Sequence, residues 1–162
     1  MSKKREQLIS EVREAFRFNG QAGDAMDQAA AEYLGIHRTD GRLLDVLQMA
    51  GQMSAGELAK AGHLSPGAVT AALDRLERAG YLRRVRDEND RRRVLVEITD
   101  QLEKLTWELY GPLAASGDAM LRDLTDEHLT IMRDVMCEAA RLQMAQADRV
   151  RERFARQSST TR

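Results

Sequence analysis

The sequence predicts a mainly helical fold with one small β-hairpin. Apolar residues recur at helical spacing along most of the 162 positions, and the period changes to alternation only within residues 81–98. Hydrophobic residues make up 43% of the chain and charged residues 31%, which is the composition of a helix-rich globular protein. A chain of this length can bury a core, so we expect a single unit with helical extensions.

Two helices are expected in the N-terminal part, over 4–18 and 21–35. The first has apolar residues at helical spacing with charged residues between them. The second is rich in alanine and ends at Gly35, a plausible C-cap. Thr39 or Asp40 is placed to cap the next helix, because both side chains can accept a hydrogen bond from a free backbone amide.

The segment 54–62 is expected to form a short helix. Ser54 stands at its start and Glu57 follows three residues later, the spacing of a capping box. Gly62 is expected to close this helix.

The segment 64–80 carries the clearest helix signals in the chain. Ser65 is the expected N-cap, Pro66 takes the first helical position, and Gly80 ends the helix. Its buried face is predicted to consist of Val69, Ala72, Leu73 and Leu76.

A two-stranded hairpin is expected directly after this helix. Residues 81–85 and 94–98 have β-branched or alternating character, and the turn Asp87–Arg93 between them is polar and highly charged. From Arg75 to Arg93 the chain has eight arginines and four carboxylates, a local charge of +4 in a protein whose formal net charge is −1. A basic patch on an acidic body is typical of a surface that faces phosphate.

Helical spacing resumes at Asp100. The pair Gly111–Pro112 is expected to kink or interrupt that helix. The residues Thr125–Glu127 are expected to start a long last helix, with carboxylates near its positive end. The polar tail 156–162 is expected to fray.

A short helix, a tight turn, a capped second helix and a hairpin make a winged helix–turn–helix, which indicates binding to double-stranded DNA. The exposed positions at the start of the second helix are small, so its backbone can approach a groove closely, and Ser65 and Thr70 can bond to phosphate or base edges. The arginines at the tip of the hairpin, Arg91 to Arg93, can enter a minor groove, and Asp90 can orient one of them. The alternatives are a surface helix with small residues by chance and a solvated, charged turn.

The stretch LSPGAVTAALDRLERAGYLRRVRDENDRRRVLVEITD resembles the core of the MarR family of bacterial transcriptional regulators, over roughly residues 39–100. The resemblance implies an obligate homodimer, a recognition helix in the major groove, a wing in the minor groove and a pseudo-palindromic operator. It implies a repressor relieved by a small molecule. In the family, the position of Arg75 either supports the recognition helix or contacts a phosphate, and that of Asp90 supports the wing. The positions that correspond to DNA contacts or to their support are Ser65, Pro66, Gly67, Thr70, Arg75, Asp90, Arg91 and Arg92.

The resemblance also implies a division of the chain. Residues 1–36 and 100–155 are expected to form the dimerisation region, and residues 37–99 the DNA-binding lobe. A small aromatic or phenolic effector is expected between them. The aromatic groups near that junction are the candidate effector residues, with a role in packing alone as the alternative: Phe16, Tyr33, His37, Trp107 and Tyr110.

Other classes of function have little support in the sequence. The three histidines lie far apart and there is one cysteine, so we expect no metal site, no cofactor and no enzymatic activity. No apolar run is long enough to span a membrane and no signal peptide is recognisable, which favours the cytoplasm. Cys137 is expected to be a buried apolar thiol, with an oxidant-sensing regulator as the alternative. A winged helix that serves as a protein-interaction module is a further alternative.

Overall fold

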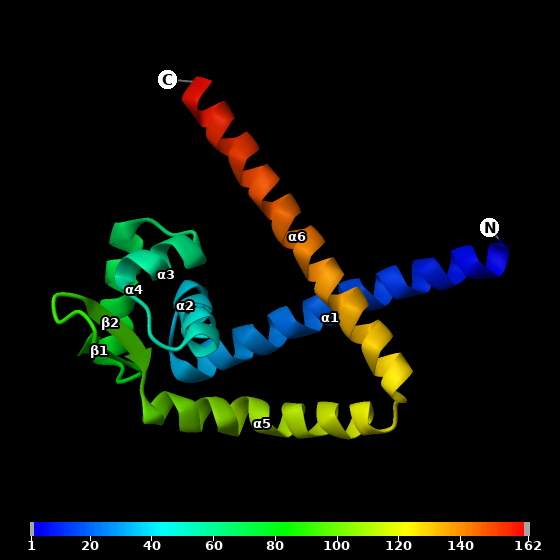
Figure 1. The fold of residues 1–162 in the computed structure, drawn as a ribbon, viewed down its shortest axis with the longest axis horizontal. Coiled ribbons are helices and arrows are strands. Elements are labelled where there is room, and N and C mark those ends of the chain that lie inside the picture. The colour runs from blue at the N-terminus through cyan, green and yellow to red at the C-terminus, as the bar shows by residue number, and fades with distance from the viewer. Residues whose placement is uncertain (1, 161–162) are drawn as a thin grey trace. The chain divides into compact units, whose positions relative to one another are not determined.

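The computed structural model describes residues 2–160, and its elements are mainly helical with one antiparallel hairpin, as predicted (Figure 1). Two compact units are present, one up to Tyr110 and the other from Gly111. In chain order the elements are α1 (Lys3–Leu34), α2 (Arg38–Ala50), α3 (Ala55–Gly62), α4 (Pro66–Arg78), β1 (Leu82–Arg86), β2 (Val94–Ile98), α5 (Asp100–Arg122) and α6 (Asp126–Thr160).

Helix α1 is continuous, so the prediction of two separate helices was wrong. Its glycines, Gly20 and Gly23, lower helix propensity but remove no backbone hydrogen bond, and α1 contains no proline. Ser2 caps the start through its side chain, and Gly35 ends the helix in the left-handed conformation at a φ of 66°.

The cap predicted for α2 was also wrong. His37 occupies the N-cap position and makes no side-chain cap bond. Asp40 lies in the first turn with 1% of its surface exposed, and its carboxylate binds Arg75 of α4. A long-range charged partner therefore takes the side chain that local pattern assigned to capping.

Helices α3 and α4 form as predicted at their N-termini. Ser54 and Glu57 make the reciprocal capping box of α3, and Ser65 accepts a hydrogen bond from the Ala68 amide at the start of α4. The end of α3 differs, because His63 and not Gly62 adopts the left-handed conformation.

Gly62 is instead the last residue of α3, and its place is explained by close packing. A Cβ at this position would lie 2.9 Å from Cδ2 of Leu43 on α2. The missing side chain allows the end of α3 to approach α2.

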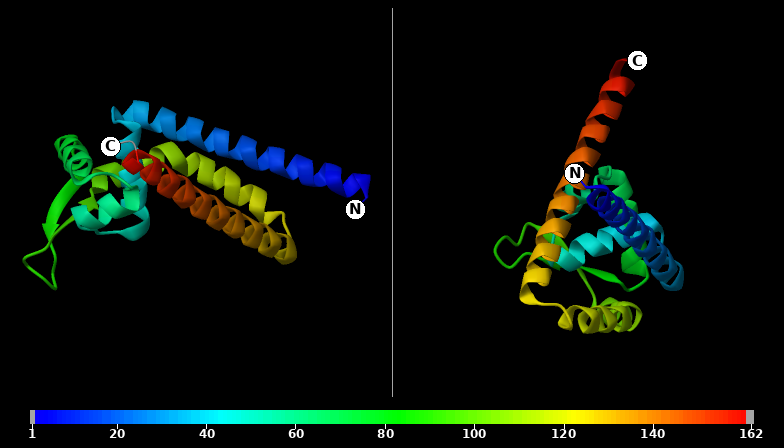
Figure 2. Two further views of the ribbon diagram at one scale, coloured as in Figure 1. Left: turned by 90° about the horizontal axis from the view of Figure 1, so that it is seen from above. Right: turned by 90° about the vertical axis from the view of Figure 1, so that its right-hand side faces the viewer.

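The hairpin pairs Leu82 with Ile98 and Arg86 with Val94, which places the charged turn at its far end. That turn projects beyond the helices of the lobe in each view of the ribbon (Figure 2). Met53, just before α3, adds backbone hydrogen bonds to Val96 of β2. One apolar core joins α2, α3, α4, the hairpin and the start of α5, and consists of Leu43, Leu44, Leu47, Leu58, Val69, Ala72, Leu73, Leu76, Leu82, Val96 and Leu102.

The second unit contains the end of α5 and all of α6. The interruption predicted at Gly111–Pro112 is absent, since α5 continues through Pro112. Thr125 caps α6 by accepting a hydrogen bond from the amide of His128 at 3.2 Å. Helix α6 continues to Thr160, so most of the segment expected to fray is helical, and residues 161–162 lie outside the described residues.

Candidate nucleic-acid interface

The N-terminal turn of α4 presents small, exposed groups to solvent. Ser65, Pro66, Gly67 and Thr70 are all exposed, while the apolar face of the helix is buried in the core. Thr70 donates its hydroxyl hydrogen to the Pro66 carbonyl at 3.0 Å, so its oxygen stays available as an acceptor. The turn thus offers a close-approach surface. Of its first amides, that of Gly67 is left for a ligand, because Pro66 has no N–H and Ser65 accepts from the amides of Ala68 and Val69.

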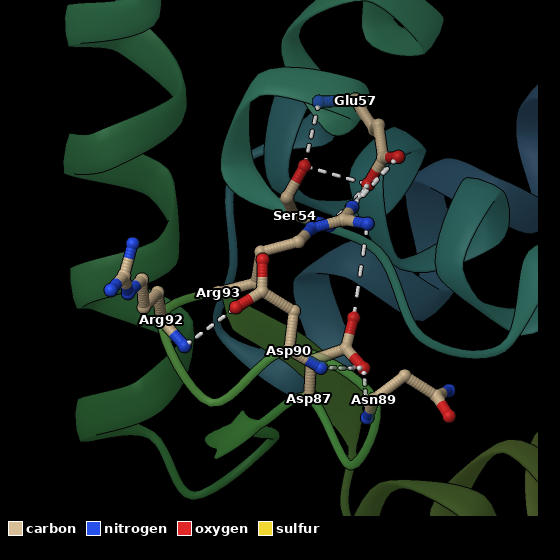
Figure 3. A network of polar contacts seen from close by, with 7 residues as sticks. All are labelled: Ser54, Glu57, Asp87, Asn89, Asp90, Arg92 and Arg93. Atoms are coloured by element: carbon tan, nitrogen blue, oxygen red, sulfur yellow. Dashed lines mark hydrogen bonds and ion pairs between the residues drawn. The ribbon is translucent and has the colours of Figure 1, made fainter.

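Two aspartates fold the turn between β1 and β2. Asp87 Oδ1 accepts hydrogen bonds from the amides of Asn89 at 2.8 Å and Asp90 at 3.3 Å (Figure 3). Asp90 Oδ1 accepts from the amide of Arg92 at 3.0 Å. The Asp90 carboxylate was expected to hold an arginine side chain, but it holds the backbone of Arg92 instead and leaves the guanidinium group free. Asx-type bonds of this kind are a common way to fix a polar turn.

Arg93 fastens the base of the turn to α3. Its Nη2 lies 3.0 Å from Oε1 and 3.1 Å from Oε2 of Glu57, and its Nη1 lies 3.8 Å from Asp87 Oδ2. Glu57 also accepts hydrogen bonds from the hydroxyl and the amide of Ser54, at 2.6 and 2.8 Å (Figure 3). These two bonds, followed by Arg93, lower the pKa of Glu57 to about 2.

The sequence identified Glu57 only as a cap, and missed its second partner. Position 93 is thirty-six residues away along the chain, so no local pattern links the two. The excess acceptor capacity of a carboxylate in a capping box is the only signal that the sequence offers.

Half of the eight arginines of the basic segment are bound to carboxylates. Arg83 pairs with Glu97 at 2.5 Å, and Arg84 pairs with both Asp74 and Glu77 on α4. Within residues 2–160, no ion pair is made by four of the eight: Arg78, Arg86, Arg91 and Arg92. Three of these lie on the hairpin, so the local positive charge is concentrated on it.

Arg75 lies in a different environment from the arginines of the turn. Its Nε and Nη2 atoms donate to the two oxygens of buried Asp40, at 2.9 and 2.6 Å. The guanidinium group therefore ties α4 to α2, which is the helix-supporting alternative of the two roles implied for it. A phosphate contact by Arg75 stays a prediction.

The effector candidates are only partly brought together. A cavity of about 600 Å³ lies among α1, α2 and the first part of α5, and of the five candidates Tyr110 alone lines it. Tyr33 and Trp107 are exposed, at 65% and 73%, and His37 is exposed at the start of α2. Phe16 lies half-buried on α1, outside the lining of this cavity.

The sequence missed the charged residues of this cavity. Asp24, Asp27, Arg38, Arg42 and Asp45 all line it. Charged residues are frequent on every helix of the chain, so composition and spacing do not separate these five from residues on solvated faces.

Three further features of the described residues concern other kinds of function: potential metal ligands, apolar helix stretches and the cysteine thiol. Over residues 2–160 there is no cluster of three or more potential metal ligands. Among the helices of that same range, none has an apolar stretch long enough to cross a membrane. Cys137 is exposed on α6 of the single chain, and its burial by packing in a dimer stays a prediction.

A capped helix with a small exposed face, followed by an arginine-rich hairpin, defines a winged-helix DNA-binding protein. Residues 36–94 match the family model described as the MarR family. The uncharacterized HTH-type transcriptional regulator YcgE of Bacillus subtilis strain 168 is 38% identical over 148 residues, which cover 91% of this chain and 96% of that protein. The chain belongs to the MarR family of transcriptional regulators, and is a DNA-binding regulator of transcription.

Solved structures agree on the fold. A crystal structure of NadR in complex with 4-hydroxyphenylacetate matches with a TM-score of 0.53 and 26% identity, and covers 86% of this chain and 94% of that one. A mutant of S. aureus MepR bound to an oligodeoxyribonucleotide matches with a TM-score of 0.54 and 21% identity, over 80% of this chain and 95% of that one.

Proposed function

We propose that this protein is a homodimeric repressor that binds a pseudo-palindromic operator and is released by a small organic effector. The observation that carries the DNA-binding part is the distribution of the arginines. Four of the eight arginines between residues 75 and 93 are held by carboxylates, whereas, among the described residues, three of the other four, Arg86, Arg91 and Arg92, lie unpaired on the hairpin. A projecting hairpin with free guanidinium groups fits the narrow, electronegative minor groove.

In this proposal α4 enters the major groove. Ser65, Gly67 and Thr70 approach phosphates and base edges at its N-terminus, Arg92 enters the minor groove, and Arg91 contacts the backbone beside it. The oligodeoxyribonucleotide bound to the MepR mutant is consistent with DNA binding by this fold. Asp90 acts on the backbone of the turn, and Arg75 supports α4 from inside.

Exposed apolar side chains support the homodimer. Helix α1 exposes Leu8 and Val12, and α6 exposes Leu142 and Val150, each by more than half. Large apolar surface of this kind on helices is typical of subunit interfaces. Residues 1–36 and 100–155 are the proposed dimerisation region, and residues 37–99 the proposed DNA-binding lobe.

The cavity supports regulation by an effector. Helix α2 lines the cavity with Arg42 and Asp45, and the same helix holds α4 through Asp40. A ligand that shifts α2 would therefore change the position of the recognition helix, and with it the fit of two recognition helices to successive major grooves. A small molecule bound to NadR is consistent with this mode of regulation.

The protein acts in this proposal by binding and not by catalysis, in the cytoplasm where the chromosome lies. A gel-shift and footprinting experiment with the DNA upstream of its own gene tests the proposal. A protected pseudo-palindrome with half-sites about one helical turn apart is the expected result. A winged helix that serves only as a protein-interaction module would give no footprint on this DNA, and would shift it no more than it shifts unrelated DNA.

A further inference from the structure

The cavity among α1, α2 and α5 has a buried apolar side and a charged, open side. Ala30, Ala31, Leu44 and Leu102 are buried and form the apolar side. The charged residues are exposed, so a bound molecule would meet them at the water-accessible edge. This division suits a small amphipathic ligand, with an apolar body and one polar end.

The charges at the open side are unequal. Arg38 is held in an ion pair by Asp24, which cancels one charge of each sign. Of the charged lining residues, Asp27, Asp45 and Arg42 remain, so the balance is one negative charge. Among the described residues, no ion pair joins Arg42 to Asp27 or to Asp45.

Burial and neighbouring carboxylates raise the pKa values of two groups at this side of the cavity, Asp45 and Tyr110. Burial and then Asp27 raise the pKa of Asp45, and Arg42 opposes them only in part. The hydroxyl of Tyr110 donates to Asp27 Oδ1 at 3.1 Å. Burial, this bond and the charges of Asp27 and Asp45 raise the pKa of Tyr110 to about 12. A further anion at this place is therefore disfavoured, and a cation is favoured.

We propose that this cavity binds an organic cation with an apolar group, whose charge lies between Asp27 of α1 and Asp45 of α2. The apolar group rests on the buried side formed by the alanines and leucines. This inference rests on the proposed effector function and names the chemical class of the effector. An ionised form of the phenolic effector that the resemblance implies would place its negative charge beside two carboxylates.

The test compares three probes of similar shape on the full chain by isothermal titration calorimetry. The probes are the benzylammonium cation, neutral benzyl alcohol and the benzoate anion. We expect the cation to bind at least about tenfold more tightly than either of the others. All three probes share a phenyl ring and differ chiefly in the charge of the polar end. Stronger binding of benzoate, or equal binding of all three, would overturn the inference.

Substitutions locate the site of the cation. Asp45→Asn and Asp27→Asn keep the side-chain size, and each is expected to lower the affinity for the cation severalfold while leaving that for benzyl alcohol unchanged. Asp118→Asn on α5, which removes a carboxylate outside the cavity, is the matched control and is expected to bind like the wild type. Unchanged cation binding in both cavity variants would place the cation elsewhere and refute the assignment. The comparison of the three probes on the wild type decides the class of ligand without any variant. The inference is therefore testable even where a variant does not fold.

A second readout separates the inference from the proposed function. Operator affinity is measured with each probe at saturating concentration. Cation binding that leaves operator affinity unchanged would contradict the effector role and keep the ligand class. Release of the operator by benzoate, but not by the cation, would keep the effector role and overturn the ligand class.

Discussion

The free guanidinium group of Arg92 gives the sharpest prediction about DNA binding. Asp90 fixes the backbone amide of Arg92, and no carboxylate among the described residues holds the side chain. Arg92→Ala therefore removes a charge from the hairpin without breaking a contact within the protein. We expect weaker operator binding, with a smaller dependence on salt.

The size of the effect follows from counterion release. One neutralised phosphate contributes about 0.9 to the slope of log affinity against log salt. A homodimer inserts two hairpins, so Arg92→Ala is expected to lower the slope by about 1.8. Over a rise from about 50 to about 200 mM salt, the wild type would then lose about twelvefold more affinity than the variant does.

Fluorescence anisotropy with a labelled operator at several salt concentrations measures this slope. Arg83→Ala is the matched control, because it removes an arginine of the same hairpin whose guanidinium group is bound to Glu97. We expect the control to keep a slope close to that of the wild type. An unchanged slope for Arg92→Ala, or an equal decrease in both variants, would refute the assignment of Arg92 to the groove.

Five further outcomes are expected. Glu57→Gln should keep the cap of α3 and lose the ion pair with Arg93, so both operator affinity and the melting temperature are expected to fall. Because the pKa of Glu57 is lowered from 4.5 to about 2, the stability that its charge contributes is fully present above pH 4.5 and is lost as the pH falls through about 2, which NMR of the Arg93 side chain can follow. Asp40→Ala should lower stability in urea denaturation and weaken operator binding, since it removes the tie between α2 and α4. Leu47→Ala, at a fully buried position, should lower the free energy of unfolding by about 2–5 kcal/mol in the same assay. After peroxide treatment, Cys137→Ser and the wild type should bind the operator with equal affinity. A loss of affinity in the wild type alone would establish an oxidant sensor.

Local signals predicted the lobe well. The capping box at Ser54, the cap at Ser65 and the alternation of the two strands each involve residues a few positions apart, and the structure confirms all three. The four residues predicted for the buried face of α4 are all in the core. Period and capping are properties of short segments, so one sequence suffices to identify them.

Features that depend on distant parts of the chain were not predicted. The burial of Asp40 follows from Arg75, thirty-five residues later, and the anchoring of the hairpin follows from Glu57 and Arg93. Five aromatic residues were expected near an effector site, and of these Tyr110 alone lines the cavity among α1, α2 and α5, whose helix faces were not known from the sequence. Which side chains share a cavity depends on packing, and spacing along one helix does not contain that information.

The two partners of Glu57 have a consequence for how the family varies. Glutamine serves as well as glutamate in a capping box, so the cap alone would allow either residue at position 57. An ion pair with Arg93 allows only the acid. Among relatives of this chain, we therefore expect the two positions to change together: glutamate where position 93 is basic, and free exchange with glutamine where it is not.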